Sequence, residues 1–506
     1  MKVVFALFDS LNRKSLEPYG AETIKTPNFT RLAQKSVTFD THYVGSLPCM
    51  PVRRDMQTGR LSFLHRSWGP IEPFDDAFAE IMFEKSVYSH LVTDHYHYWE
   101  DGGATYHNRY DTFEFVRGQE RDPWKAMVQP PWERLREKYH ALQFSDERRH
   151  KFTQYMINRE FLSKEEEDFT AVQCFTHGLS FLDVNRDADQ WFLQIETFDP
   201  HEPFFAPERY RKDYPTNYSG PILDWPPYAR VNEAPDECAE LRANYCAIVA
   251  LCDAQMGRLL DYFDAHDLWR DTALVVSTDH GFLLGEHDWW AKLRMPCYEE
   301  VAHIPLFIYH PDHADKAGQR RKALTQTVDL MATFLDLFAI APPPDVQGRS
   351  LLPLLAHDTA IREAALYGVF GSATNITDGR YTYFRYPDDM QDQALFNYTT
   401  MATNITSRFG VDELAEAEIG GPFAFTKGAR VLKVPALPKY PGGGRFLTPG
   451  FFQDTETVLY DLAHDPGQTT PIRDAAVENR LARLMTALMR DTDAPPEAYT
   501  RMGLAP

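Results

Sequence analysis

Short, almost unbroken runs of apolar residues are the feature that most restricts how this chain can fold. They lie at residues 3–8, 191–197, 273–278 and 304–309. Runs of this length and composition are typical of strands buried on both faces. Helical patterns separate them, at residues 28–34, 238–263 and 326–338. The alternation predicts an α/β fold with a mostly parallel central sheet.

Two segments depart from this pattern. Residues 99–170 are charged and aromatic, with helical patterns at 133–144 and 145–161. We predict a helical insertion here that covers the sheet edge, closes over a site or makes an oligomer contact. After three prolines at 342–344 come two strand-like segments, 380–386 and 459–462, and an amphipathic helix at 476–489. We therefore predict a large α/β domain at 1–360, which would carry any catalytic site, and a smaller α+β subdomain at 361–506.

Composition narrows the possible partners. A formal charge of −21 and a pI near 5.3 argue against nucleic acid, which requires a basic surface. The first apolar run is too short for a signal peptide, and no stretch has the length of a membrane span. Six cysteines in 506 residues make neither a disulfide framework nor a zinc pattern. We expect a cytoplasmic protein without a membrane partner.

Acidic residues follow two of the predicted strands. Asp9 comes directly after residues 3–8, and Asp279 and His280 come after residues 273–278. Ligands of open α/β sheets bind beyond the carboxyl ends of the strands, and carboxylates with a histidine suit a divalent cation. Alone, Asp9 would be read as a cap and His280 as a turn residue. Their equivalent positions on two strands favour a metal site.

Cys49 lies in the segment Cys49-Met50-Pro51-Val52-Arg53, with Thr58-Gly59 following. A lone cysteine is usually a buried apolar residue. A phosphatase with a cysteine nucleophile would need arginine where Asp55 stands. Cys-x-Pro-x-Arg instead resembles the signal of the formylglycine-dependent (type I) sulfatases and the related phosphonate monoester hydrolases of the alkaline phosphatase superfamily.

The resemblance continues along most of the chain. It is carried by residues 25–28, 278–281 with Lys292, 327–330, 348–352, 378–381 and 459–462. It implies an alkaline-phosphatase-like fold, in which helices flank a mostly parallel sheet and a smaller α+β subdomain follows. The insertion at 99–170 and the region 388–455 have no counterpart.

The resemblance also implies a metal site. Asp9, Cys49, Asp279 and His280 match positions that bind one divalent cation. Sulfatases often have a second acid after the first, and here that position is Ser10. His280 stands where the animal enzymes have asparagine. A nitrogen ligand suits Mn²⁺ better than Ca²⁺, and both cations stay open. Arg53 matches the arginine that neutralises and orients the formylglycine.

Four further residues match positions that handle the substrate anion. His201 and Lys292 match the pair that holds the anion and protonates the leaving group. His95 falls where many sulfatases have a histidine, and we assign it as the base; a hydrogen-bonded structural histidine is the alternative. Thr93 stands where those enzymes have lysine, so one positive contact to the anion is missing.

The implied activity is metal-dependent hydrolysis of sulfate monoesters, as in arylsulfatases. Cys49 would be oxidised to formylglycine by a maturation enzyme, and one hydroxyl of the hydrated aldehyde would attack the anionic small-molecule ester. A homo-oligomer is expected from the insertions. Two alternatives stay open. The first is a phosphonate monoester or phosphodiester hydrolase with the same site, and the second is a non-catalytic binding protein in which Cys49 remains a thiol.

Overall fold

An eight-stranded sheet forms the centre of the computed structural model, which describes residues 1–506 except 145–148, 163–164, 392 and 437–449 and the side chains of 149–152. Its order is β12-β2-β11-β8-β1-β7-β5-β6. The strands are β1 (Lys2–Phe8), β2 (Val37–Phe39), β5 (Tyr88–Thr93), β6 (Thr112–Phe115), β7 (Trp191–Thr197), β8 (Thr272–Thr278), β11 (Leu306–Tyr309) and β12 (Arg320–Arg321). β11 is antiparallel to β2 and β8, and the other neighbouring pairs are parallel. The predicted mostly parallel sheet is confirmed.

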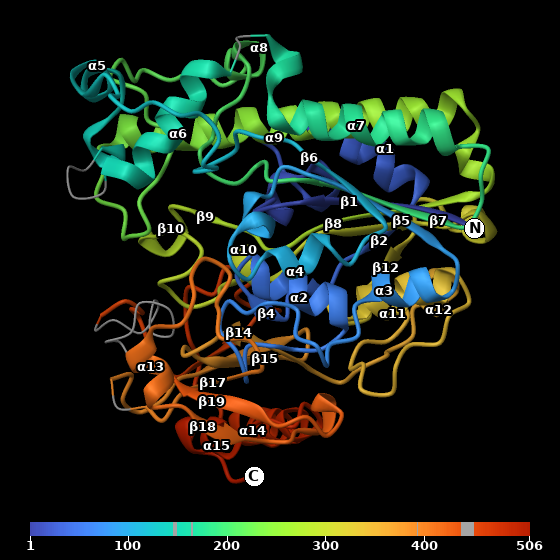
Figure 1. Ribbon diagram of the computed structural model, residues 1–506, viewed down its shortest axis with the longest axis vertical. Coiled ribbons are helices and arrows are strands. Elements are labelled where there is room, and N and C mark those ends of the chain that lie inside the picture. Colours follow the sequence, from blue (N-terminus) through green and yellow to red (C-terminus); the bar gives the residue numbers. More distant parts are fainter. Residues whose placement is uncertain (145–148, 163–164, 392, 437–449) are drawn as a thin grey trace.

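Helices cover both faces of this sheet (Figure 1). One layer holds α1 (Pro27–Lys35), α7 (Thr170–Asn185) and α9 (Pro235–Ala265), and the other holds α2 (Met50–Thr58), α3 (Phe78–Glu84) and α11 (Asp329–Leu337). Alternate residues of β1 enter the two layers: Phe5 packs with Phe334, and Phe8 packs with Phe29. Burial of each such side chain contributes about 1.5–3 kcal/mol. Two apolar layers explain why the strand carries no polar alternation.

The insertion differs from the prediction in two places. β6 lies within it and adds an edge strand beside β5, so the segment is not only helical. The helix expected at 133–144 ends early, as α5 (Trp132–Lys138), because the backbone at Tyr139 and His140 extends to pair with Ile222. The helix expected at 145–161 corresponds to α6 (Arg149–Phe161). Residues 145–148 of the expected range lie outside the described residues.

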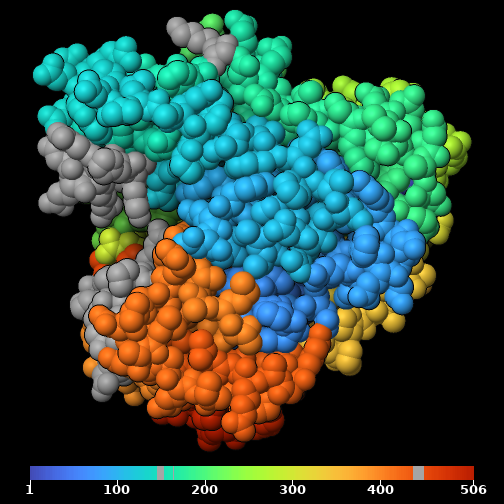
Figure 2. Space-filling view, viewed as in Figure 1, coloured from blue at the N-terminus to red at the C-terminus, as the bar shows by residue number. Residues whose placement is uncertain are grey.

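The C-terminal part contains a second sheet of order β20-β16-β15-β14-β4. Four of its strands come from the chain after residue 361: β14 (Ala365–Val369), β15 (Thr374–Thr377), β16 (Tyr381–Arg385) and β20 (Val458–Asp461). The fifth, β4 (Ser46–Leu47), comes from the N-terminal part and ends shortly before Cys49. Helix α14 (Ala475–Asp491) packs on this sheet. The orange and red C-terminal part forms the lower end of the molecule in Figure 2.

Among the described residues, we find no helix with the length and hydrophobicity needed to cross a bilayer.

Candidate active site

Strand register brings the acidic residues together. Phe8 at the end of β1 is level with Thr197 of β7 and Thr278 of β8. Asp9 and Asp279, the next residues on β1 and β8, therefore emerge side by side at the carboxyl edge. Glu196, the penultimate residue of β7, points its carboxylate to the same place and is fully buried.

Cys49 reaches this edge from another direction, as the residue before α2. Its backbone has φ 37° and ψ −91°, a conformation that costs a non-glycine residue energy. Asp55, one and a half turns into α2, holds the preceding loop in place. Its carboxylate accepts hydrogen bonds from the backbone and hydroxyl of both Ser46 and Ser62. Burial raises the pKa of Asp55 to about 7. This residue, which the sequence used only to exclude a phosphatase loop, anchors the segment that presents Cys49.

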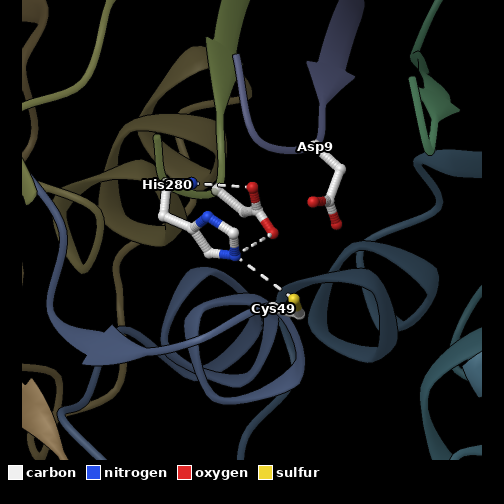
Figure 3. A group of neighbouring side chains, drawn as sticks. Asp9, Cys49 and His280 are labelled. Atoms are coloured by element: carbon white, nitrogen blue, oxygen red, sulfur yellow. Dashed lines mark hydrogen bonds and ion pairs between the residues drawn. The ribbon is translucent and has the colours of Figure 1, made fainter. Parts of the chain in front are cut away.

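The four predicted metal-binding residues converge. Figure 3 shows three of them, Asp9, Cys49 and His280, around one point. One ligand atom from each of Asp9, Cys49, Asp279 and His280 lies within 4.8 Å of the others, and all four residues are buried. Cys49 Sγ is 3.2 Å from His280 Nε2. The other ring nitrogen, His280 Nδ1, lies 2.9 Å from the carbonyl oxygen of Gly281 and must donate to it. That bond leaves Nε2 free of a proton and facing the cluster, the form in which histidine binds a metal.

Gly281 is required by close packing. A Cβ at this position would lie 1.8 Å from the carbonyl oxygen of Glu300 and 2.7 Å from Asn12 Oδ1. The third residue of the Asp279-His280-Gly281 segment therefore has to be glycine for the loop to seat against its neighbours.

Arg53 ties the acidic residues together. Its guanidinium donates to Glu196 Oε1 at 2.7 Å, to Asp279 Oδ2 at 2.7 Å and to Asp9 Oδ2 at 3.0 Å. The side chain is 1% exposed, so the three ion pairs are shielded from water. Arg53 lies one helical turn after Cys49, and the spacing of the pentapeptide sets this position.

Lys292 comes directly after β10 (Trp290–Ala291). Its ammonium donates to Ser10 Oγ at 2.9 Å and is 3.7 Å from Asp9 Oδ1. Ser10 Oγ in turn donates to Asp9 Oδ1 at 2.8 Å, and Ser10 N donates to Asp279 Oδ1. The serine at the place of a second acid thus serves as a hydrogen-bonded link between Lys292 and the two aspartates.

The charges at this edge fit a divalent cation. Four carboxyl groups, those of Asp9, Asp279, Glu196 and Glu202, lie around two permanent cations, Arg53 and Lys292. Burial alone would raise the pKa of Asp9, but the charges of Lys292 and Arg53 outweigh it and hold this pKa well below its usual value. Burial and the charge of Asp9 raise the pKa of Asp279 to about 8. Two carboxyl groups that share a proton near neutral pH repel each other when both are ionised, and a bound cation would remove that repulsion. Two carboxylates and an imidazole are suitable donors for it.

His95 and His201 lie near the aspartates. His95 Nε2 is 4.0 Å from Asp9 Oδ2, and neither ring nitrogen has a hydrogen-bond partner among the described residues. Burial and Arg53 lower the pKa of His95 well below its usual value. His201 Nδ1 is 2.5 Å from the carbonyl oxygen of Glu202, and the ring packs edge-on against Phe198.

Thr93 lies at the end of β5, level with Glu196. Its hydroxyl accepts a hydrogen bond from the backbone of His95, so its contact in the structure is to the loop carrying that histidine. Thr93 therefore contacts the backbone of His95 and lies next to Glu196 at the carboxyl end of the sheet. A direct contact with substrate stays a prediction.

Sequence reasoning assigned no role to several residues of this site. Glu196 lies inside an apolar strand, where a charged residue is itself a signal of a paired or functional group. Glu202 follows His201, and its carboxylate accepts a hydrogen bond from Tyr228. Glu120, from the 99–170 insertion, is buried with φ 45° and contributes to the field at His201. No local pattern in the insertion links Glu120 to the strand ends.

Comparison with known proteins gives two family matches. The model described as "Sulfatase" matches residues 2–340, more than half of the chain. The model described as "N-sulphoglucosamine sulphohydrolase, C-terminal" matches residues 285–413.

Individual proteins agree with the family matches. The chain is 26% identical over 383 residues to the multifunctional alkaline phosphatase superfamily protein PehA of Trinickia caryophylli, covering 66% of this chain and 72% of that protein. The fold of this chain is similar to that of a solved protein in complex with its substrate D-glucosamine-2-N,6-O-disulfate. The TM-score is 0.64 at 16% identity, over 98% of this chain and 99% of the other. The phosphonate monoester hydrolase of Agrobacterium radiobacter gives a TM-score of 0.63 at 18% identity, over 97% and 95%.

Proposed function

The chain belongs to the sulfatase family, a family of sulfuric ester hydrolases, and from this premise we propose that it hydrolyses sulfate monoesters through a formylglycine made from Cys49. One observation carries the proposal: ligand atoms of Asp9, Cys49, Asp279 and His280 lie within 4.8 Å of one another. The cysteine is thus in the place where a cation would activate the group made from it. Burial raises the pKa of the Cys49 thiol, so the unmodified side chain would be a poor nucleophile at neutral pH.

Asp9, Asp279 and His280 would hold one divalent cation together with the modified residue 49. When bound, the cation would supply Lewis-acid help, lowering the pKa of the attacking hydroxyl and neutralising the ester oxygens. We propose Mn²⁺ or Ca²⁺, with the imidazole of His280 favouring Mn²⁺.

The chain's own residues would bind and protonate the ester. Lys292 is held next to Asp9 and provides a buried positive charge for the sulfate. His201 would give a proton to the departing alcohol oxygen as its bond to sulfur breaks. His95 would take a proton from the second hydroxyl of the hydrated formylglycine as the bond from residue 49 to the sulfate oxygen breaks and the aldehyde re-forms, because its lowered pKa keeps the ring neutral, with one nitrogen unprotonated. Arg53 would hold Asp9 and Asp279 in place throughout.

A phosphonate monoester or phosphodiester hydrolase is the second candidate. Three observations favour it: the His280 ligand position, threonine at position 93 in place of a lysine, and similarity to the multifunctional PehA protein and to a phosphonate monoester hydrolase. Rates on 4-nitrophenyl sulfate and on an aryl phosphonate monoester, measured side by side, decide between them. We expect the sulfate to be faster; a much faster phosphonate reaction would reverse the order.

Mass spectrometry tests the nucleophile. We expect the peptide that contains residue 49 to carry formylglycine when the protein is produced together with a formylglycine-generating enzyme, its proposed maturation partner. An unmodified thiol under those conditions would support the third reading, a non-catalytic binding protein. A cytoplasmic location and a homo-oligomeric state stay predictions from the sequence.

A further inference from the structure

Glu202 places a buried carboxylate between the two groups proposed to meet the leaving alcohol. Its Oε2 is 3.3 Å from His201 Nδ1 and 3.8 Å from Lys292 Nζ. Glu202 is 1% exposed, so both interactions are screened little by water. A carboxylate in this position acts on both cations at once.

Tyr228 fixes the orientation of that carboxylate. The Tyr228 hydroxyl donates to Glu202 Oε1 at 2.5 Å. The second oxygen, Oε2, is buried and accepts no hydrogen bond from the described part of the chain. With one oxygen anchored, the other is left to face His201 and Lys292.

The position of the His201 protons follows from its neighbour. A carbonyl oxygen only accepts, so the bond from Nδ1 to the carbonyl of Glu202 requires a proton on Nδ1. Neutral His201 therefore has no proton on Nε2. To donate a proton from Nε2 the ring must first be an imidazolium, and a buried imidazolium needs an anion beside it.

We propose that Glu202 is a positioning residue for leaving-group protonation, which holds His201 in the orientation that presents Nε2 and stabilises its cationic form. The inference rests on the proposed function. As the bond between sulfur and the alcohol oxygen breaks, its electron pair stays on that oxygen and the proton passes to it from Nε2. His201 is then neutral, with its Nδ1 proton still bound to the Glu202 carbonyl.

The surrounding charges make Glu202 necessary for this state. Burial lowers the pKa of His201, and Lys292 lowers it further. Glu202, Asp9 and Glu120 oppose that shift, and Glu202 has the largest effect of the three. Asp9 is committed to Arg53 and Lys292, and Glu120 comes from the separate insertion. Glu202 is the carboxylate that contacts the ring directly.

A trio elsewhere in the molecule offers a matched control. Tyr43 donates to Glu299 Oε1 at 2.8 Å, and His303 Nδ1 is 2.6 Å from Glu299 Oε2. The residue types and the order of contacts are the same as in Tyr228, Glu202 and His201, and both glutamates and both histidines are buried; Tyr43 is buried as well, whereas Tyr228 is partly buried. Glu299 belongs to α10 (Glu299–Ala302) and has no part in the proposed reaction.

The test compares two esters that differ in how much they need an acid. Phenyl sulfate expels a poor leaving group, whereas 4-nitrophenyl sulfate expels a good one. We expect Glu202→Gln to lower kcat about tenfold on phenyl sulfate and less than about twofold on 4-nitrophenyl sulfate. Removing the charge lowers the His201 pKa, so the basic limb of the kcat profile for phenyl sulfate should move to lower pH. Tyr228→Phe should show the same trend with a smaller change.

Three controls keep the test decisive. Glu299→Gln should alter neither the ratio of the two rates nor the pH profile. Glu202→Asp, which keeps the charge, should restore part of the lost ratio. Tyr228→Phe replaces Glu202→Gln as the test if that variant does not fold. An equal loss on both esters, or no loss, would overturn the inference. If wild-type protein with confirmed formylglycine hydrolyses neither sulfate, the proposed function fails, and the same ratio is then measured on phenyl and 4-nitrophenyl phosphonate monoesters.

Discussion

Two trios of tyrosine, glutamate and histidine, one at the carboxyl edge of the sheet and one around α10, show how surroundings decide the use of the same side chains. In the trio of Tyr43, Glu299 and His303, every side-chain oxygen and nitrogen has a hydrogen bond, since His303 Nε2 also contacts the carbonyl of Asp40 at 2.6 Å. The rings of Tyr43 and His303 stack at 4.5 Å. These contacts are typical of a structural element.

The trio of Tyr228, Glu202 and His201 lies in a region where more of the buried polar atoms have no hydrogen-bond partner among the described residues. Glu202 Oε2 and both ring nitrogens of His95 have no hydrogen-bond partner within the described chain. The four neighbouring carboxyl groups outnumber the two permanent cations, Arg53 and Lys292. A buried polar atom without a partner costs about 1–3 kcal/mol. We infer that the unpaired polar groups of this region are available to bind a cation and an anionic ester, whereas the polar groups of the other trio are paired within the protein.

The largest difference between the two regions is expected when one cysteine in each, Cys49 and Cys297, is replaced by alanine. Cys49→Ala should lower kcat/KM for the preferred ester about 10⁴-fold, because the nucleophile is lost while the surrounding charges remain. Cys297→Ala, near Glu299, should leave kcat/KM unchanged and reduce the free energy of unfolding by about 1–2 kcal/mol. Steady-state kinetics and urea unfolding measure both. Equal kinetic effects of the two substitutions would remove the distinction between the regions.

Removal of the cation should have the next largest effect. We expect a chelator to lower the rate about 10³-fold and to lower the Tm, since a cation bound only by the folded state stabilises it. Readdition of Mn²⁺ or Ca²⁺ should restore both, and the better cation identifies the preferred one. Glu299→Gln should respond to chelator as the wild type does. A Tm that ignores the chelator would contradict a site at Asp9 and Asp279.

Arg53→Lys tests whether the guanidinium organises the carboxylates at the carboxyl end of the sheet. A lysine ammonium cannot make three directed bonds to Asp9, Glu196 and Asp279 at once, so the aspartates lose their fixed positions. We expect kcat/KM to fall about 10²-fold and the free energy of unfolding to fall by about 3 kcal/mol. Kinetics with thermal unfolding measures the two losses. Unchanged activity would show that Arg53 does not organise the site.

The smallest effect is expected at the structural trio. Glu299→Gln should reduce the free energy of unfolding by about 1–3 kcal/mol through the lost charge-assisted contacts to Tyr43 and His303. Its kcat/KM should stay within about twofold of the wild type. A large kinetic loss with little change in stability would show that the two trios are coupled, and the contrast would then have to be abandoned.

The central sheet could be predicted because strands buried on both faces appear in the sequence as short, unbroken apolar runs. The predicted ends of β1, β7 and β8 agree with the structure within one residue. The direction of β11 could not be read, because an apolar run is the same in either orientation. Helix α5 was predicted too long, since the pairing of Tyr139 with Ile222 is a contact between residues distant in the sequence.

The site was predictable where a motif or a strand end marked it. Asp9, Asp279 and His280 follow predicted strands, and Cys49 with Arg53 lies in a recognisable pentapeptide. Tyr228 and Glu120 gave no such signal, because the folding of remote loops brings them near His201. Glu202 stood beside His201 in the sequence. Its importance follows from three contacts that only the fold shows, with the His201 ring, with Lys292 and with Tyr228.

The shared register of β1, β7 and β8 has a consequence for how such a protein can change over time. The backbone ladder, and not the loops, sets the spacing of Asp9, Glu196 and Asp279. Segments outside these three strands could be exchanged or lengthened by evolution or by an engineer while Asp9, Glu196 and Asp279 keep their places. New substrates could then be acquired one loop at a time on an unchanged chemical platform.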